Sequence, residues 1–210
     1  MKKTILVTLL QMIITCCSAQ FNVVPIENWR EIFTENPHLK DVNGVLNKYV
    51  GEWQYSDNAN FFKIKFYKIE NVSEPYINGQ HVFDELRSFI IFKEFHNNAW
   101  ITIYDTYPVN INQVDINNQN FNNRHIIHGN LVGITNDDIA LYYDEPSSSC
   151  IRSKSAIVDI KYHLNNSGAP LLRWLFSWDN LEPTSIICPD GMLPDDSLFK
   201  IPKNMTLNKI

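Results

Sequence analysis

The sequence lacks several features that would assign it to a functional class at once. It has no apolar segment of about 20 residues, the length that a transmembrane helix needs. It contains no Gly-x-Ser-x-Gly motif, no phosphate-binding glycine loop and no calcium-loop pattern, so none of the enzyme classes that these motifs mark is indicated. No fixed-period repeat occurs, which excludes a solenoid.

An excess of positive charge is also lacking. The chain of 210 residues has 18 Lys and Arg against 23 Asp and Glu, which gives a net charge of −5. Its lysines are spread along the sequence, so we expect neither a nucleic-acid partner nor an anionic membrane surface as partner. The composition is 44% hydrophobic and 12% aromatic, which indicates a globular domain rich in aromatic side chains.

The N-terminus has the pattern of a secretory signal. Two lysines precede an apolar stretch from Ile5 to about Ile14, and small residues end at Ala19. Such a stretch of roughly 10 residues is too short to span a bilayer. We therefore expect residues 1–19 to be cleaved and residues 20–210 to form one exported domain, periplasmic or secreted, because this length suits a single core.

A lipid anchor at Cys16 or Cys17 is the alternative, because a cysteine just after an apolar run is where lipoproteins are cut and acylated. It is disfavoured because Ile14 and Thr15 stand where a small residue is usual.

Cysteine is scarce once the signal is removed, since only Cys150 and Cys188 remain. A lone pair in an oxidising compartment most often forms a disulfide. The bond would close a loop of about 38 residues, worth about 3 to 4 kcal/mol in the chain-entropy model. The alternative, a nucleophilic cysteine, is disfavoured because neither residue has a histidine nearby in sequence.

After the signal, the segment Pro25–Glu35 has the period of a short amphipathic helix. Ile26, Trp29 and Phe33 fall on one helical face, Pro25 suits the first turn, and Pro37 follows the end. We expect this helix to cover one end of the domain. A loop-rich stretch is expected to follow as far as Lys48.

From Tyr49 onward the apolar period changes to two, which is typical of half-buried strands. In Asn60–Glu70, for example, the apolar residues Phe62, Ile64 and Phe66 alternate with Lys63, Lys65 and Tyr67. The nine predicted strands are Tyr49–Ser56, Asn60–Glu70, Asp84–His96, Ala99–Thr106, Arg124–Asn136, Asp138–Glu145, Lys154–Leu164, Pro170–Asp179 and Met205–Ile210.

The predicted turns and loops complete this scheme. The Asn97-Asn98 and Asn136-Asp137 pairs predict hairpin turns. Two segments lack clear alternation: the Asn- and Gln-rich Tyr107–Asn123 and the proline-rich Leu181–Asn204. We expect both to be irregular. Strands with one apolar face must then close into a barrel or pack as a sandwich, and we expect an all-β antiparallel meander closing into a barrel of about eight or nine strands.

Gly51 and Trp53 favour the barrel. A glycine inside a strand marks a bend or a close backbone approach, and the tryptophan two residues on points to the same face. The pair resembles the Gly-x-Trp signature of the first strand of lipocalins and related calycin barrels, in which the indole closes one end. In that family an arginine near the last strand packs across the tryptophan, and Arg173 is the nearest candidate here.

A second resemblance covers most of the chain. The segments LNKYVGEWQY (Leu46–Tyr55), ALYYDEP ending at Pro146, LLRW (Leu171–Trp174) and IPKNMTLNKI (Ile201–Ile210) resemble an exported family of Gram-negative bacteria that is known only as a domain of unknown function, DUF6705. This resemblance implies export and a β domain, and it implies no catalytic residue.

Aromatic side chains form the best candidate ligand site. Such walls bind apolar ligands because each buried ring contributes about 1.5 to 3 kcal/mol. Arg173, Ser88 and Thr102 are candidate polar groups for orienting a ligand. The same aromatic residues can instead fill a small barrel completely. The predicted wall consists of Trp53, Trp100, Tyr104, Trp174, Phe176 and Trp178.

Catalytic and metal sites are not indicated. His125 and His128 are three apart, so on a strand they point to opposite faces and do not meet one ion. Paired aspartates such as Asp137-Asp138 and Asp195-Asp196 stand in turn-like settings, where carboxylates cap backbone amides.

The sequence therefore predicts an exported, non-catalytic protein that binds a small apolar or amphipathic molecule and needs no cofactor. The alternative is an envelope structural or protein-interaction module with a filled core, and a hydrolase is a third, weaker alternative. An internal cavity would favour the first, and a filled interior with an exposed apolar patch the second. The oligomeric state is left open.

Overall fold

The computed structural model describes residues 22–31, 37–76, 79–107, 127–133, 135–144, 155–180 and 199–210. Within these ranges it contains two 3-10 turns, η2 (Ile26–Glu31) and η3 (Val45–Lys48). The strands are β1 (Asn22–Pro25), β2 (Pro37–Lys40), β3 (Gly51–Ser56), β4 (Asn60–Tyr76), β5 (Gly79–His96), β6 (Ala99–Asp105), β7 (Ile127–Val132), β8 (Asp138–Asp144), β9 (Ser155–Leu164), β10 (Pro170–Asn180) and β11 (Asn204–Lys209).

Eight of these strands close into an antiparallel barrel, as the alternation predicted. Going round the barrel, the order is β3, β4, β5, β7, β8, β9, β10 and β11, and β11 pairs with β3 to complete the circle. Every neighbouring pair is antiparallel, so the barrel is an up-and-down meander. Strand β6 lies outside the circle and pairs with β5.

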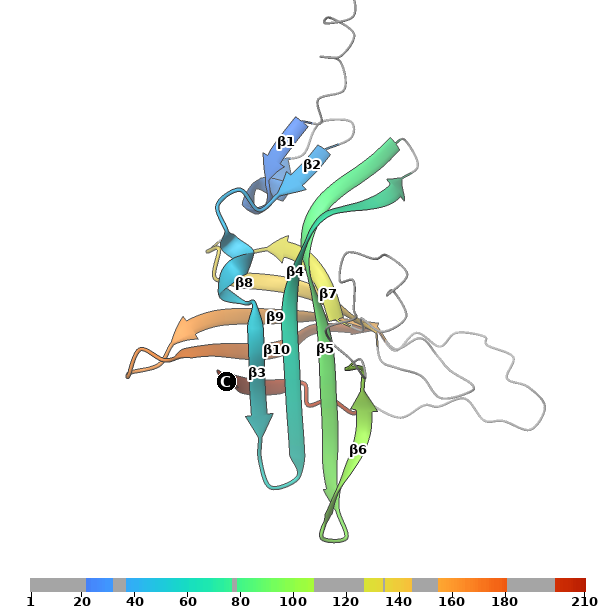
Figure 1. The fold of residues 1–210 in the computed structure, drawn as a ribbon, viewed down its shortest axis with the longest axis vertical. Coiled ribbons are helices and arrows are strands. Elements are labelled where there is room, and N and C mark those ends of the chain that lie inside the picture. Colours follow the sequence, from blue (N-terminus) through green and yellow to red (C-terminus); the bar gives the residue numbers. More distant parts are fainter. Residues whose placement is uncertain are drawn as a thin grey trace, which may run out of the picture.

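The barrel is built from two sheets that cross each other. Strands β3, β4 and β5 form the front sheet, and β8, β9 and β10 run across behind them (Figure 1). The two junctions are short. Among the described residues, β5 meets β7 through the pairs Leu86–Gly129 and Arg87–His128, and β3 meets β11 through two pairs as well. The arrangement is therefore close to two orthogonally packed sheets with one shared core.

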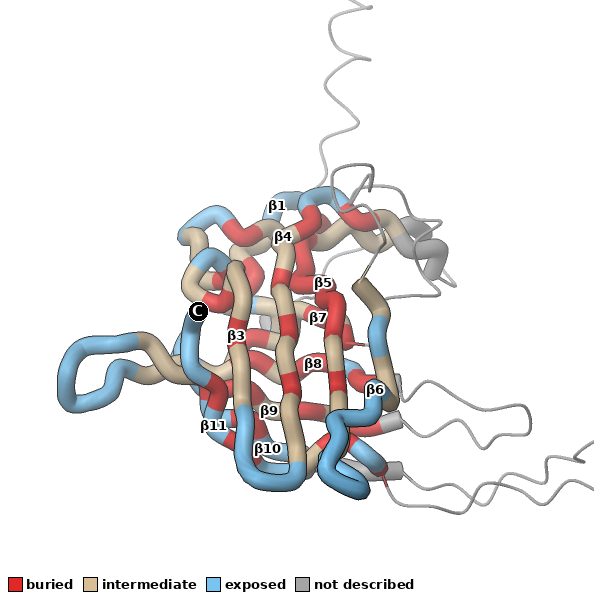
Figure 2. The backbone as a smooth tube through the Cα atoms, turned by 60° about the horizontal axis from the view of Figure 1, so that its bottom comes forward, coloured by how far each residue is buried: buried red, intermediate tan, exposed pale blue. Residues whose placement is uncertain are grey.

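The core lies between the two sheets. Residues 84–90 of β5 are all buried, whereas from Asn60 to Tyr67 of β4 buried positions alternate with partly exposed ones (Figure 2). This is the period of two on which the sequence-based prediction depended. All eight barrel strands contribute buried apolar side chains to one continuous cluster.

The N-terminal segment differs from the predicted helix. Residues 22–25 form β1, which pairs in parallel with β2, and only a 3-10 turn, η2, follows before the described residues end at 31. Asn28, with φ −97° and ψ 15°, kinks that turn. Ile26 is still buried, and the Trp29 indole donates a hydrogen bond to the Val132 carbonyl (2.9 Å), so the segment does cover one end of the barrel.

The loop expected as far as Lys48 also contains structure. Strand β2 pairs in parallel with β5, and η3 follows it, ending just before Tyr49. Strands β4 and β5 are longer than predicted because the ladder continues past a register shift between Ile69 and Val72. Asn71 has φ 57° at this bulge. A left-handed residue of this kind is hard to anticipate from alternation alone.

The predicted hairpin turns are confirmed. Asn97 and Asn98 both have positive φ (51° and 61°) between β5 and β6, and Asn136 has φ 58° between β7 and β8. These values match the left-handed turns that Asn favours. The predicted irregular segments Tyr107–Asn123 and Leu181–Asn204 lie largely outside the described residues.

Candidate functional site

Trp53 lies inside the barrel, near the start of β3. Its side chain is fully buried, and its indole nitrogen donates to the Tyr49 carbonyl at 2.7 Å. Gly51 makes this geometry possible, because its φ of 119° is disallowed for other residues. A Cβ at Gly51 would also lie 3.3 Å from the Lys209 side chain. Tyr162 packs edge-on against both Tyr49 and Trp53.

The Tyr49 hydroxyl is the polar group left over in this part of the core. It is buried and has no hydrogen-bond partner. Burial raises the pKa of Tyr49 well above its usual value, and the charges of Asp137 and Asp138 raise it further. Tyr49 is therefore neutral at all physiological pH values.

Three members of the predicted aromatic wall lie farther along the core, where Trp174 pairs with Ile160 of β9 and Phe176 with Val158. Trp174 is fully buried, 5.4 Å from Phe62 and 6.1 Å from Phe176 between ring centres. Phe176 and Tyr104 are half-buried, and Tyr104 packs on Phe92 at 6.2 Å. The predicted wall residue Trp178 lies on β10 beyond a register shift, and its side chain is outside what the structure describes.

Among the described residues, side chains fill the interior between Trp53 and Trp174. None of the following inward-facing residues exposes more than 3% of its surface to a water-sized molecule: Trp53, Phe62, Ile64, Phe66, Ile90, Phe92, Ile127, Val132, Ile139, Leu141, Tyr143, Ala156, Val158, Ile160, Leu172, Trp174, Met205 and Leu207. An internal cavity would leave accessible surface on the residues that line it. The inward hydroxyl of Ser88 is satisfied within the protein, since it donates to the Ile127 carbonyl at 3.0 Å.

Three predicted site residues, Trp100, Thr102 and Arg173, lie on the outer surface instead. Trp100 is 44% exposed on β6, and Arg173 is exposed on β10, where it pairs with Lys161 and Thr206 on the outward side. Arg173 therefore does not pack across Trp53. Lys209 takes that place, with its Nζ 5.1 Å from the ring centre. Adjacent residues of a strand point to opposite faces, so Arg173 points outward because its neighbour Trp174 points into the core.

Arg173 instead lines a shallow hollow on the back sheet. The hollow has a volume of about 380 Å³ and is bordered by Asp138, Asp159, Lys161, Arg173 and Leu175. Lys161 reaches Asp138 at 3.4 Å. Since most of these side chains are well exposed, water competes for every charge in the hollow.

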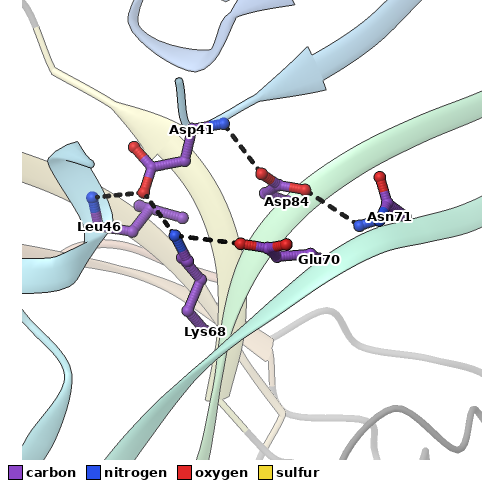
Figure 3. Close-up of polar contacts among 6 residues, drawn as sticks. All are labelled: Asp41, Leu46, Lys68, Glu70, Asn71 and Asp84. Atoms are coloured by element: carbon purple, nitrogen blue, oxygen red, sulfur yellow. Dashed lines mark hydrogen bonds and ion pairs between the residues drawn. The ribbon is translucent and has the colours of Figure 1, made fainter. Parts of the chain in front are cut away.

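A buried polar cluster connects the N-terminal segment to the barrel (Figure 3). Asp84 on β5 is 1% exposed and accepts backbone hydrogen bonds from Asp41 and from Asn71, both at 3.0 Å. Asp41, just after β2, accepts from the Leu46 amide at 3.2 Å and from Lys68 at 3.4 Å. The two carboxylates thus tie together β2, η3 and the bulge in β4.

This cluster is suited to anchoring rather than to chemistry. The Asp41 side chain is fully buried, and its second oxygen has no hydrogen-bond partner. Burial lowers the pKa of Lys68, but the charge of Asp41 and hydrogen bonds to Glu70 and Asp41 outweigh burial, so the net shift is upward. Lys68 therefore stays charged beside Asp41. The two carboxylates accept hydrogen bonds from backbone amides and from Lys68. A substrate would have to displace these donors before it could bind the carboxylates.

Histidines do not assemble a metal site in the described part of the chain. His128 lies 3.5 Å from Glu85, which also binds Arg87, at the β5–β7 junction. No group of three or more His, Cys, Asp or Glu residues is placed to hold an ion among the described residues.

His125, Cys150, Cys188 and Asp195-Asp196 lie outside those residues, so the disulfide stays a prediction. No helix in the described ranges is long and apolar enough to cross a membrane.

The exposed aromatic residues form a patch on the outer face of the β4–β5–β6 sheet, which we call the hairpin patch. It consists of Phe61, Lys93, Phe95 and Trp100. Trp100 packs on Phe95 at 5.2 Å and on Phe61 at 6.4 Å, while Lys93 lies 5.7 Å above the Phe61 ring. Sequence reasoning missed Phe95. Phe95 is three residues after the inward-facing Phe92, so on a strand it points to the opposite, outer face, and this spacing could have revealed it.

Next to the hairpin patch lies the outer edge of β6. This strand pairs with β5, and no described strand pairs with its other side. Residues 99–102 are all exposed, including Ile101 at 47%. The strand carries no charge from Ala99 to Tyr104 and no proline, the devices that usually protect an edge.

Comparison with known proteins adds the family. The model of a family of unknown function, DUF6705, matches residues 1–210. No curated protein and no solved structure matches the chain, so no lipocalin relative supports the Gly-x-Trp resemblance. The eight-stranded barrel with its filled interior and exposed hairpin is thus the fold of a chain that belongs to the family of unknown function DUF6705.

Proposed function

We propose that this protein is an exported, non-catalytic interaction module whose binding surface is the β5–β6 hairpin. The observation that carries the proposal is the contrast between the filled barrel and the exposed hairpin. The inward residues have almost no accessible surface, whereas Trp100, Ile101 and Phe95 are 44%, 47% and 39% exposed. Exposed apolar side chains that cluster are characteristic of interaction sites.

The hairpin offers the two components that strand addition requires. The outer edge of β6 presents backbone N–H and C=O groups, and an extended segment of another polypeptide can pair with them. Trp100 and Ile101 point to opposite faces of that edge, so an added strand gains apolar contacts on both faces. Tryptophan is among the residues that contribute most to protein interfaces. The expected occupant is therefore an extended, apolar strand of a protein partner.

Site-specific photo-crosslinking in the native host tests this proposal. A photoreactive phenylalanine replaces Trp100 in one variant and Tyr142, on β8 of the back sheet, in the control variant. The two positions are matched in exposure, at 44% and 46%. We expect a discrete crosslinked product from position 100 and none from position 142.

A second substitution links the product to the strand edge. Adding Ile101→Lys to the Trp100 variant places a charge on the edge without touching the hairpin patch, and the product should disappear. Equal crosslinking from both positions, or a product that survives Ile101→Lys, would show that the edge of β6 is not the binding surface.

A small apolar ligand is the second candidate, and one observation favours it. The indole nitrogen of Trp174 is buried without a hydrogen-bond partner, beside the half-buried Phe176. An unsatisfied donor costs about 1 to 3 kcal/mol, and a ligand acceptor beside this indole would remove that cost.

Native mass spectrometry of protein isolated from its own envelope tests this candidate. A co-purifying small molecule supports it, and unliganded protein that no lipid stabilises against heat counts against it.

A further inference from the structure

We infer that the partner of the β6 edge is a second copy of the same chain, bound by antiparallel pairing of β6 with β6. This inference rests on the proposed function, because it names the occupant of the same surface. It is argued from the order of side chains along β6, from the faces to which they point, and from the absence of charge between Ala99 and Tyr104.

The side chains of β6 are assigned to faces by their partners on β5. Trp100 pairs with Phe95 and Thr102 with Lys93, and both partners belong to the outward hairpin patch. Ile101 pairs with Glu94 and points to the other face. Ile103 falls at a register shift opposite Phe92 and packs against the core, so it too lies on the inner side.

Only some two-fold registers keep these faces matched. In an antiparallel pair, directly opposed residues must point to the same side of the sheet. A two-fold axis at Ile101 opposes Ile101 to itself, Trp100 to Thr102 of the second copy, and Ala99 to Ile103 of the second copy. All of these pairs match in face. An axis at Thr102 would oppose Trp100 to Tyr104, which points inward to Phe92, so this register is disfavoured.

The favoured register also covers the apolar surface that is now exposed. The two copies of Ile101, each 47% exposed, pack on each other on the inner face. Each Trp100 packs over Thr102 of the other copy, between the two hairpin patches. The sheet then continues through β5, β6 and both strands of the second copy, so the outer edge of β6 is then paired. Such a two-fold contact uses the same surface twice and closes without forming a filament.

Charge does not oppose this contact, although the whole chain carries −5. The opposed residues 99–103 are all uncharged. Asp105 falls opposite Asn97 of the second copy, and the glutamates at position 94 are separated by both β6 strands. The paired segment is only five residues long because the register shift at Phe92 ends it. We therefore expect a dimer that dissociates on dilution.

Light scattering of the purified exported protein over a range of concentrations tests the inference. The wild-type protein should reach twice the monomer mass at high concentration. Because position 101 faces itself, Ile101→Lys and Ile101→Glu each oppose two like charges and should weaken the dimer by about tenfold or more. An equimolar mixture of the two variants should recover the dimer. Tyr142→Lys, an equally exposed change on β8, is the control and should behave as wild type.

Cysteine crosslinking fixes the register. Opposed residues in an antiparallel pair have Cα atoms about 4.5 to 5.5 Å apart, which is within disulfide range. Ile101→Cys should therefore crosslink two copies on oxidation, and Thr102→Cys, which faces Trp100, should not. The wild-type protein, which retains Cys150 and Cys188, is the background control.

The outcomes separate this inference from the proposed function. A wild-type protein that is monomeric at every concentration, or charge variants that fail to recover the dimer together, overturns the second-copy inference. If photo-crosslinking at position 100 still gives a product, the partner is another protein and the proposed function stands. If that product is absent too, both fail.

Discussion

The barrel interior and the β5–β6 hairpin are both rich in aromatic side chains, yet they have opposite environments. Trp53 and Trp174 are fully buried, whereas Trp100 is 44% exposed and packs on the partly exposed Phe61 and Phe95. All three tryptophans lie in strands, Trp53 in β3, Trp174 in β10 and Trp100 in β6. The difference comes from the neighbouring sheet: the back sheet covers the inner face of β3 and β4, and no described residue covers the outer face at Trp100.

The largest expected effect comes from removing an interior ring. Trp53→Ala should lower the free energy of unfolding by about 3 to 5 kcal/mol, because it leaves a cavity in the core and frees the Tyr49 carbonyl. Urea unfolding followed by circular dichroism measures the change. A loss below about 1 kcal/mol would mean that the interior at Trp53 is loosely packed, and the contrast with the hairpin would no longer hold.

The next effect concerns the backbone that positions the interior tryptophan. Gly51→Ala should cost about 1 to 3 kcal/mol, because alanine is strained at φ 119° and its Cβ would approach Lys209. Thermal unfolding of this variant beside Gly168→Ala gives the comparison. Gly168 also has positive φ (81°), but no atom lies within 4 Å of a Cβ there, so any difference between the two variants reports the crowding against Lys209 and the different φ values.

A smaller effect is expected from the buried hydroxyl of Tyr49. Tyr49→Phe removes a polar group without a partner, so stability at neutral pH should be unchanged or higher by up to about 1 kcal/mol. The raised pKa of Tyr49 in the folded state means that only the unfolded chain ionises near pH 10. Wild-type stability is therefore complete below pH 10 and declines above it.

The Tyr49→Phe variant should lack the part of that alkaline decline that Tyr49 causes. Unfolding free energies of both proteins between pH 8 and 11.5 measure the difference, and the other tyrosines cancel in the comparison. A difference that stays constant above pH 10 would indicate that the Tyr49 hydroxyl has an ordinary pKa.

The smallest effect on stability is expected at the exposed tryptophan. Trp100→Ala should change the free energy of unfolding by only about 0.5 kcal/mol, because its ring is largely in water in the monomer. The same urea experiment, at a concentration where the protein is monomeric, provides the measurement. A loss as large as that of Trp53→Ala would show that Trp100 belongs to a packed core.

Alternation predicted the barrel well because each strand must bury one face. The inward residues of β4, β9 and β10, such as Phe62, Val158 and Trp174, were identified by their spacing. It failed at the N-terminus, where Ile26 and Trp29 also fit a helical period. In the structure these two residues lie in the 3-10 turn η2, kinked at Asn28, which follows the parallel pairing of β1 with β2, and the order of local residues does not reveal such a pairing.

The candidate site was predicted less well, for a related reason. Trp100 was assigned to the predicted aromatic wall, and Arg173 was chosen because the calycin resemblance implies an arginine that packs across the tryptophan. Alternation distinguishes two faces but does not say which one is inside. Phe95 and the outer edge of β6 became visible only when the strand order placed β6 outside the circle.

By itself the sequence determined the period of two, the Asn turns and the glycine that lets Trp53 enter the core, because these depend on local backbone and side-chain preferences. The tertiary structure alone decided that the described inward side chains pack with almost no accessible surface and that no described strand pairs with the outer edge of β6. Both depend on how strands far apart in the chain meet. Closure through β5 and β7, two pairs long, leaves β6 on the outside, and that geometry turns an ordinary apolar strand into the proposed binding surface.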